Sequence, residues 1–312
     1  MYSQLALRLK FFSTVAVVAV LVGCASAPMA PSSGVIAPVV PDIPAVVPTI
    51  PKVPPRIGLA LGGGAARGFA HVGVIQVLEE AGIRPSLVVG TSAGSLVAAI
   101  YASGKTGAQL QQVALTMEEG AITDWMLPIF SNGMMRGDAL ARYVNTQVAS
   151  KTIEAMPLPL GVVATDLQTG QGILFQRGDT GTAVRASSAV PAVFLPVKIA
   201  GHDYVDGGLV SPVPVRFARQ MGAELVIAVD ISSPPEGNIP VGMMQILLQT
   251  FSIMGKSINS FELKEADVVI RPALIGVSSA DFSARRRSIE AGRQAMLQLL
   301  PQLKATIAAK SR

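Results

Sequence analysis

Residues Leu87-Val-Val-Gly-Thr-Ser-Ala-Gly94 join a short β-branched run to a serine set between glycines, and a small apolar helical segment (95–102) follows. This is the G-x-S-x-G pattern in a strand–turn–helix context. Ser92 would occupy a tight turn with strained backbone angles, and Gly90 and Gly94 remove side chains that would collide there. The helix would direct its first N–H groups toward negative charge that develops at the serine. The stretch therefore predicts a nucleophile presented at the end of a buried strand.

A second glycine-rich loop lies upstream. The strand expected at Ile57 to Leu61 runs into Gly62-Gly-Gly-Ala-Ala-Arg-Gly68, and a helix is expected from Phe69 to Ala81. Such a loop exposes backbone N–H groups around a concavity. It could be a dinucleotide-binding turn or an oxyanion hole. A dinucleotide-binding turn needs an acidic residue at the end of the next strand, where this chain has the serine motif instead. The oxyanion interpretation is favoured because it uses both loops.

The third motif, Tyr204-Val-Asp-Gly-Gly208, offers a base, which a serine hydroxyl needs to become nucleophilic. The chain has two histidines, of which His71 is expected on a buried helix face and His202 in an exposed turn. Asp206 precedes two glycines that allow close approach. In a partly desolvated cleft its carboxylate would have a raised pKa and could take the serine proton directly. Asp166, which follows another strand, is expected to cap a turn.

The rest of the body alternates apolar runs with helical patterns. Strands are expected at 57–61, 86–89, 160–164, 172–175, 225–229 and 268–270, and helices at 69–81, 93–103, 107–117, 139–149 and 288–309, the last with Pro301 inside it. This alternation predicts an α/β fold with a mostly parallel sheet.

The three motifs, in this order, resemble those of the patatin-like phospholipase family. The similarity also covers Ala164-Thr-Asp-Leu167 and Arg185-Ala-Ser-Ser-Ala-Val-Pro191, and it extends into the C-terminal helix, so that it spans residues 56–310. The resemblance implies a three-layer α/β fold, with a mostly parallel central sheet and helices on both faces. It also implies a Ser-Asp dyad without histidine.

The resemblance assigns roles to individual residues. Ser92 would be the nucleophile, and Asp206 the base that activates it and later a water molecule. The oxyanion hole would be formed by backbone N–H groups of Gly63, Gly64 and Ala65, and Arg67 would brace the loop or add positive charge to it. The remaining motif glycines are Gly62, Gly68, Gly90, Gly94, Gly207 and Gly208. Ala65 stands where plant members have a third glycine. Neither a cofactor nor a metal site is expected.

The N-terminal region predicts export and lipidation. Arg8 and Lys10 precede an apolar run from Phe11 to Val22, as in a secretory signal, and the following Leu21-Val-Gly-Cys24 resembles the lipobox of bacterial lipoproteins. We expect a signal peptide at 1–23, a lipidated Cys24 opening a proline-rich linker at 24–55, and a catalytic domain at 56–312. In lipoproteins of enteric bacteria, an aspartate directly after the lipidated cysteine favours retention in the inner membrane. This chain has Ala25 at that position, so we expect it to be anchored in the outer membrane, facing the periplasm of the bacterial cell envelope.

Two methionine-containing segments, Trp125 to Met135 and Val241 to Phe261, could line a lipid pocket or lid. Methionines at helical spacing are more often buried, so most of these are expected in the core. The formal net charge of +5 and the few aromatic residues do not suggest nucleic-acid binding.

The sequence thus predicts a lipid-anchored serine acyl hydrolase that acts on fatty-acyl esters, with phospholipid as the substrate class. Two alternatives remain open. An acyltransferase would use the same dyad and pass the acyl group to an alcohol, and a non-catalytic lipid-binding envelope lipoprotein would retain only the fold.

Overall fold

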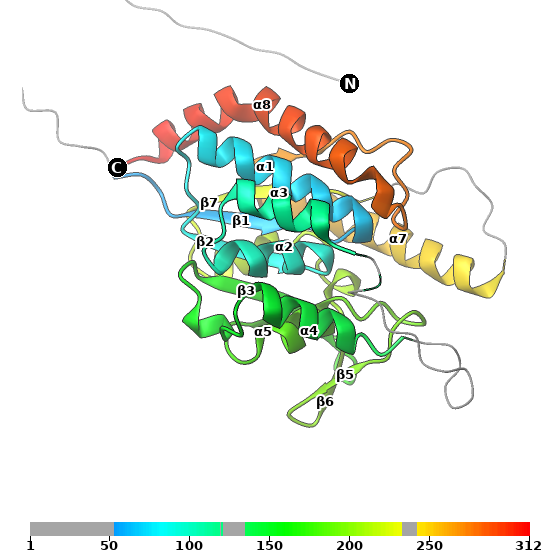
Figure 1. Ribbon diagram of the computed structural model, residues 1–312. Helices are drawn as coiled ribbons and strands as arrows, with labels where there is room; N and C mark the ends of the chain where they lie inside the picture. The colour runs from blue at the N-terminus through cyan, green and yellow to red at the C-terminus, as the bar shows by residue number, and fades with distance from the viewer. Residues whose placement is uncertain (1–52, 119, 121–134, 233–241) are drawn as a thin grey trace, which may run out of the picture. The chain divides into compact units, whose positions relative to one another are not determined.

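The structure is a computed structural model that describes residues 53–118, 120, 135–232 and 242–312 (Figure 1). The expected signal peptide, Cys24 and the linker as far as Lys52 lie outside the described residues, as do residues 125–134 of the first methionine-containing segment.

The described strands form one sheet of eight. They are β1 (Ile57–Leu61), β2 (Leu87–Thr91), β3 (Leu160–Asp166), β4 (Gly172–Phe175), β5 (Val197–Ile199), β6 (His202–Asp206), β7 (Leu225–Val229) and β8 (Val268–Ile270). Their order is β5-β6-β3-β2-β1-β7-β8, and β4 pairs with β3. Strands β3, β2, β1, β7 and β8 run parallel, whereas β4 and β6 pair antiparallel with β3, and β5 pairs antiparallel with β6. The expected mostly parallel sheet is confirmed.

Eight α-helices are described. They are α1 (Phe69–Glu80), α2 (Ala93–Ala102), α3 (Gly107–Thr116), α4 (Asp138–Gln147), α5 (Thr180–Ser187), α6 (Val215–Gln220), α7 (Met243–Glu262) and α8 (Arg285–Lys310). The last continues through Pro301. Helices α5, α6 and α7 were not expected from the sequence. Helix α6 is a six-residue segment directly after Pro214, too short to show a helical period.

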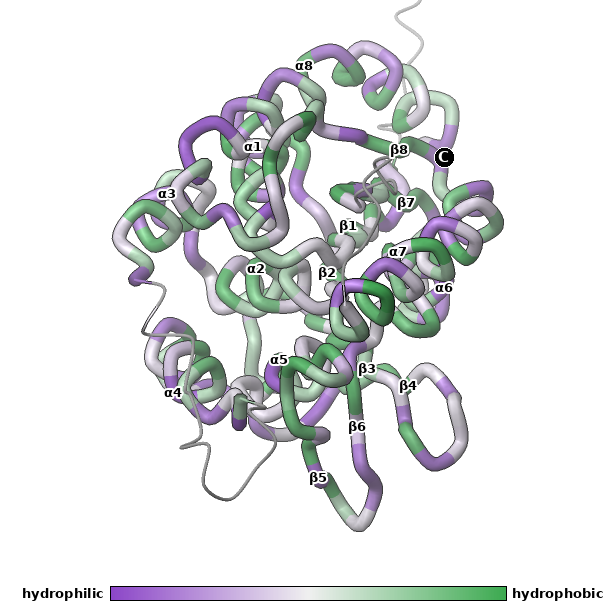
Figure 2. The backbone as a smooth tube through the Cα atoms, turned by 90° about the vertical axis from the view of Figure 1, so that its right-hand side faces the viewer, coloured by the Kyte–Doolittle hydropathy of each residue, from purple (hydrophilic) through white to green (hydrophobic). Residues whose placement is uncertain are grey.

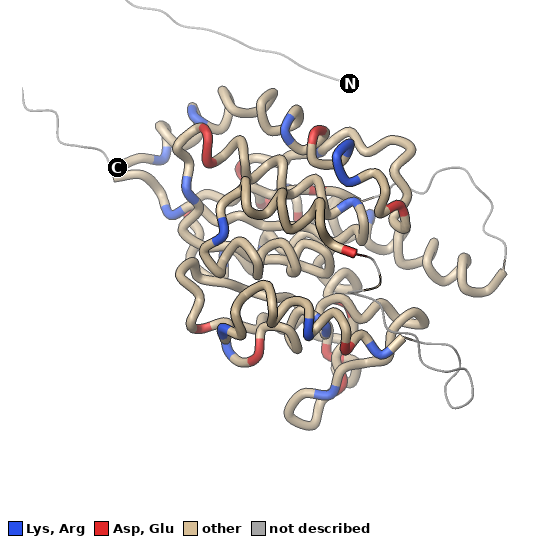
Figure 3. The backbone as a smooth tube through the Cα atoms, in the orientation of Figure 1, with Lys and Arg blue, Asp and Glu red and all other residues tan. Residues whose placement is uncertain are grey.

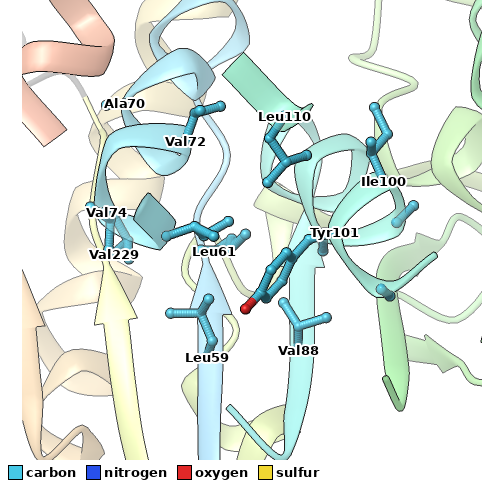
Figure 4. Close-up of a cluster of buried hydrophobic side chains, with 14 of the residues drawn as sticks. Leu59, Leu61, Ala70, Val72, Val74, Val88, Ile100, Tyr101, Leu110 and Val229 are labelled. Carbon is cyan, nitrogen blue, oxygen red and sulfur yellow. The ribbon is translucent and has the colours of Figure 1, made fainter. Parts of the chain in front are cut away.

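Apolar side chains pack on both faces of the central strands, and β1 is buried along its whole length. Leu59 and Leu61 join the core beneath α1, α2, α3 and α8 (Figure 4). Ala60 between them belongs to the core beneath α6. The two-residue period of a strand produces this division. The expected helical layers on both faces of the sheet are therefore confirmed, and the carboxyl ends of the parallel strands remain free for the motif loops.

The expectation that the methionines of residues 241–261 lie mostly in the core is wrong. Met243, Met244 and Met254 are exposed on α7, which extends beyond the other helices (Figure 1). Their spacing follows the helical period, but the apolar face that they help to form is exposed and not buried. Within the described ranges, no helix meets the length and hydropathy needed to traverse a lipid bilayer.

Candidate active site

Ser92 lies at the junction between β2 and α2, in a backbone conformation with φ 53° and ψ −124°. This region of positive φ is strained for a residue with a side chain. The flanking glycines permit it. A Cβ at Gly90 would collide with the Gly94 carbonyl, and one at Gly94 would collide with the Leu61 carbonyl. The turn therefore has the geometry of a nucleophile elbow, and it holds the serine at the carboxyl edge of the sheet.

Ser187, a buried serine at the end of α5, holds the backbone of the elbow. The Ser92 amide donates to Ser187 Oγ at 2.8 Å, and Ser187 Oγ donates in turn to the Val163 carbonyl of β3 at 2.6 Å. On the other side, Ser95 Oγ donates to the Ser92 carbonyl at 2.6 Å. The backbone before and after the nucleophile is thus held by side-chain hydroxyls.

Asp206 ends β6, and strand register brings it to Ser92. It pairs with Ala164 of β3, and Val163 of β3 pairs with Thr91 of β2, next to Ser92. A Cβ at Gly207 would collide with the Val163 carbonyl, so a glycine is required for the segment to pass this close. The antiparallel β6 therefore delivers a carboxylate to the same edge as the elbow.

The Asp206 carboxylate accepts two hydrogen bonds. The Ser92 side chain donates one, and the Gly208 amide donates the other to Oδ1 at 2.7 Å. The residue is buried, with 7% of its surface exposed. Burial raises the pKa of Asp206 to about 6, although both hydrogen bonds act to lower it. The carboxylate is hence a stronger base than an exposed aspartate but is still ionised at neutral pH.

The glycine loop after β1 lies against the elbow. Strand register places Leu61 beside Gly90, and a Cβ at Gly63 would lie 3.1 Å from Ser92 Cβ. Gly63 therefore lies directly against the side chain of Ser92.

The amides of this loop differ in their availability. Gly63 donates its amide to the Pro212 carbonyl at 2.9 Å, and Arg67 donates its own to the Gly64 carbonyl at 3.1 Å. The Gly63 amide therefore does not fit the expected oxyanion role in this conformation. Within the described residues, the amides of Gly64 and Ala65 donate to no protein acceptor. These two amides fit the role of oxyanion donors.

Ala65 adopts a left-handed φ of 49°, which an alanine tolerates less well than the glycine of plant members. Arg67 is buried, and its backbone amide closes the turn onto Gly64. The Cβ that Gly68 lacks would lie 2.9 Å from Ala93 Cβ, so this glycine lets the loop approach the start of α2.

The two histidines lie away from the proton path. His71 is fully buried, and its Nε2–H donates to the Gly62 carbonyl at 2.8 Å. Burial lowers the pKa of His71 to about 4, so the ring is neutral and supports the glycine loop. His202 Nδ1 lies 2.8 Å from Asp166 Oδ2, and Asp166 Oδ1 caps a turn by accepting the amides of Gln168 and Thr169. The expected burial of His71 and the turn-capping role of Asp166 are confirmed. His202 is exposed as expected, but it begins strand β6 instead of lying in the turn before it.

The sequence of residues 59–219 matches the family model described as "Patatin-like phospholipase". This match covers more than half of the chain. The chain belongs to the patatin-like phospholipase family. The assignment agrees with the order of the three motifs and with the carboxyl edge at which they meet.

Relatives in the family include proteins of very different organisms. An uncharacterised NTE family protein of Mycobacterium tuberculosis is 36% identical over 184 residues, which is 59% of this chain and 51% of the relative. The human patatin-like phospholipase domain-containing protein 6 is 36% identical over 191 residues, 59% of this chain and 14% of the relative. The chain thus spans about half the length of the mycobacterial relative that it matches.

A solved structure shares the fold. VipD from Legionella pneumophila superposes with a TM-score of 0.54 at 16% identity, covering 80% of this chain and 68% of VipD. At this identity the similarity concerns the fold alone.

Among the described residues, the patatin-like site contains no group of three histidine, cysteine or carboxylate side chains that could share a metal ion. Ser187 was not expected in the site, although it lies within the Arg185–Pro191 motif. Two neighbouring serines at the end of a helix do not reveal from sequence alone which hydroxyl reaches the Ser92 loop.

Proposed function

We propose that this protein is a serine acyl hydrolase that cleaves fatty-acyl esters of phospholipids through a Ser92–Asp206 dyad and an acyl-enzyme intermediate. The hydrogen bond from the Ser92 side chain to a buried carboxylate carries the proposal. A nucleophile in contact with its base, at the edge of a glycine loop, is the arrangement that nucleophilic catalysis requires.

In the first half-reaction, Asp206 takes the Ser92 hydroxyl proton while Oγ forms a bond to the acyl carbonyl carbon. The carbonyl π electrons move onto oxygen, and collapse of the tetrahedral intermediate breaks the ester C–O bond. The proton held by Asp206 goes to the departing alcohol oxygen. A pKa of about 6 suits both directions of this transfer, because the carboxylate is ionised at neutral pH and yet basic enough to accept a proton.

The oxyanion would lie at the amides of Gly64 and Ala65. Gly64 is partly exposed and Ala65 is exposed, and neither amide has a protein acceptor within the described residues. The N-terminus of the ten-residue helix α2 begins directly after Ser92 and adds a favourable dipole. Preorganised donors of this kind are typically worth 10²–10³ in rate each.

In the second half-reaction, Asp206 takes a proton from a water molecule, whose oxygen attacks the acyl carbon. The intermediate then releases Ser92 Oγ, which recovers the proton, and a free fatty acid leaves. Phospholipid as the substrate class is supported by membership of the patatin-like phospholipase family.

The test is the release of free fatty acid from bacterial phospholipids by the full chain and by Ser92→Ala. The wild type should release fatty acid and Ser92→Ala should not. A fluorophosphonate probe should label only the wild type. Release without a requirement for Ser92 would overturn the dyad. Labelling of Ser92 without release of fatty acid would show a reactive serine whose substrate is an ester other than phospholipid.

We further propose that Cys24 is lipidated and holds the protein at the bacterial outer membrane, facing the periplasm. The lipobox-like Leu21-Val-Gly-Cys24 supports this proposal. Radiolabelled palmitate should enter the wild type but not Cys24→Ser, and wild-type protein should fractionate with outer membranes. Label in both proteins would overturn the assignment of Cys24.

A further inference from the structure

The outer face of α7 is apolar and exposed. Of the ten large apolar side chains that are exposed in the described part of the chain, six lie on this one helix, so the exposure is a feature of α7 and not of the surface in general. They are Met243, Met244, Ile246, Ile253, Met254 and Phe261. Figure 2 shows hydrophobic residues along the α7 tube. Exposed apolar surface concentrated in this way marks an interaction site.

The C-terminal end of α7 is fixed to the catalytic segment. Buried Glu262 accepts a hydrogen bond from Ser211 Oγ at 2.6 Å and another from the Arg216 amide at 3.2 Å. Ser211 follows the Asp206 motif by a few residues. The C-terminal end of α7 is therefore hydrogen-bonded to the segment that follows Asp206, and the exposed N-terminal part extends away from it.

The middle of α7 reaches the glycine loop indirectly, through Pro212. A Cβ at Gly255 would lie 3.4 Å from the Pro212 side chain, and the Pro212 carbonyl accepts the Gly63 amide. A surface that holds α7 would thus lie close to both loops that flank Ser92.

The charge on α7 has one sign where the helix is exposed. From Met243 to Phe261 the helix has no aspartate or glutamate, and Lys256 is its one charged residue in that range. Lys264 follows just after the helix. Figure 3 shows no charged residue on the projecting end. An exposed apolar face, with Lys256 on the helix, Lys264 just after it and no carboxylate from Met243 to Phe261, suits the interface of an anionic bilayer.

We propose that α7 docks the protein on an anionic phospholipid bilayer, with Ile246, Ile253, Met254 and Phe261 entering the acyl boundary and Lys256 and Lys264 facing the headgroups. The helix lies along the interface and does not cross it. Docking itself does not depend on the proposed function, and only the measurement of phospholipid hydrolysis rests on it.

A second copy of the chain fits this face less well. Two α7 helices packed through their outer faces would offer Lys256 no partner, because the stretch from Met243 to Phe261 contains no carboxylate. An anionic headgroup layer supplies that charge at every position.

Insertion can be read directly from a fluorophore on α7, independently of any N-terminal anchor. In a full-chain Cys24→Ser background, Ile253→Cys carries an environment-sensitive NBD label, and Leu297→Cys on α8 is the matched control. Ile253 and Leu297 are similarly exposed helix residues, at 54% and 43%. Vesicles of phosphatidylglycerol with phosphatidylcholine should shift the Ile253→Cys emission to the blue and raise its intensity at least twofold. Pure phosphatidylcholine should do so at several-fold higher lipid concentration, and the control should not respond.

No response at Ile253→Cys, or an equal response at Leu297→Cys, would overturn the proposal. A response that grows with protein concentration in the absence of vesicles would also overturn it, because a second copy would then cover the face.

The catalytic readout uses Ile246→Glu/Ile253→Glu, with Leu297→Glu as its control. Hydrolysis of vesicle phospholipid should fall at least tenfold in the double variant, while hydrolysis of a soluble short-chain ester should stay unchanged. Equal activity on vesicles would count against docking through α7. If the wild type inserts α7 but hydrolyses neither ester, the proposed function fails and the docking stands.

Discussion

Ser187 Oγ lies 2.8 Å from the Ser92 amide nitrogen and accepts its hydrogen, although 95 residues separate the two serines. The same hydroxyl donates to the Val163 carbonyl, so it joins α5, the elbow and β3 at one point. Ser187 is fully buried. A strained φ at Ser92 persists only when its surroundings hold it, and this hydroxyl is a principal part of those surroundings.

Ser187→Ala should lower kcat by about tenfold or more while changing KM little, because the variant loosens the elbow without touching the substrate. It also leaves the Ser92 amide without its acceptor, which should cost about 1–3 kcal/mol of unfolding free energy. Steady-state kinetics and urea denaturation measure both effects. Ser188→Ala is the matched control, since the neighbouring hydroxyl is not part of this chain of bonds. Equal effects of the two variants would show that Ser187 merely packs.

The strain at Ser92 predicts different stabilities for two inactive variants. Ser92→Ala keeps a Cβ at a φ of 53°, whereas Ser92→Gly does not. Both should lose hydrolysis, and Ser92→Gly should be the more stable of the two by about 1 kcal/mol. Thermal unfolding of the purified pair measures the difference. A glycine variant that is less stable than the alanine variant would contradict a strained elbow.

The pKa of Asp206 sets the acid limit of activity. Because the carboxylate must be ionised to accept the serine proton, kcat/KM should be level above about pH 7 and fall roughly tenfold per pH unit below about pH 6. A pH series with a soluble ester measures this profile. An inflection near pH 4 would show that Asp206 is not desolvated in solution.

The same carboxylate should weaken the fold at neutral pH. Its pKa is about 6 when folded against 3.8 as an ordinary aspartate, so its contribution to stability is complete below about pH 3.8 and is lost as the pH rises through about 6. Asp206→Asn cannot ionise and should exceed the wild type by about 1–3 kcal/mol at pH 7, with a difference that shrinks toward pH 4. Denaturant titrations at both pH values test this. A pH-independent difference would assign the effect to packing instead.

Much of the site could be predicted because local chemistry dictates it. A serine between glycines after a β-branched run has few structural alternatives, and the Asp-Gly-Gly turn likewise requires close packing. The availability of the loop amides could not be predicted. Whether Gly63 donates to solvent or to Pro212 depends on where a segment about 150 residues away comes to lie. The exposure of α7 was missed for a related reason, because an apolar face has the same sequence pattern whether protein or a membrane covers it.

His71 provides the last prediction. Burial lowers its pKa to about 4 from 6.5, so the neutral ring is favoured in the fold. Its contribution to stability is present above about pH 6.5 and is lost as the pH falls toward about 4, opposite in sign to that of Asp206. His71→Gln retains an N–H donor for the Gly62 carbonyl but does not titrate. The variant should lose about 1–3 kcal/mol at pH 7 through imperfect packing, yet its stability should decline less than that of the wild type between pH 6.5 and pH 4.5. Urea denaturation in an Asp206→Asn background measures the pH dependence of stability that comes from His71, without the opposite pH dependence that comes from Asp206. Parallel slopes for the two proteins would show that protonation of His71 does not limit the stability of the glycine loop.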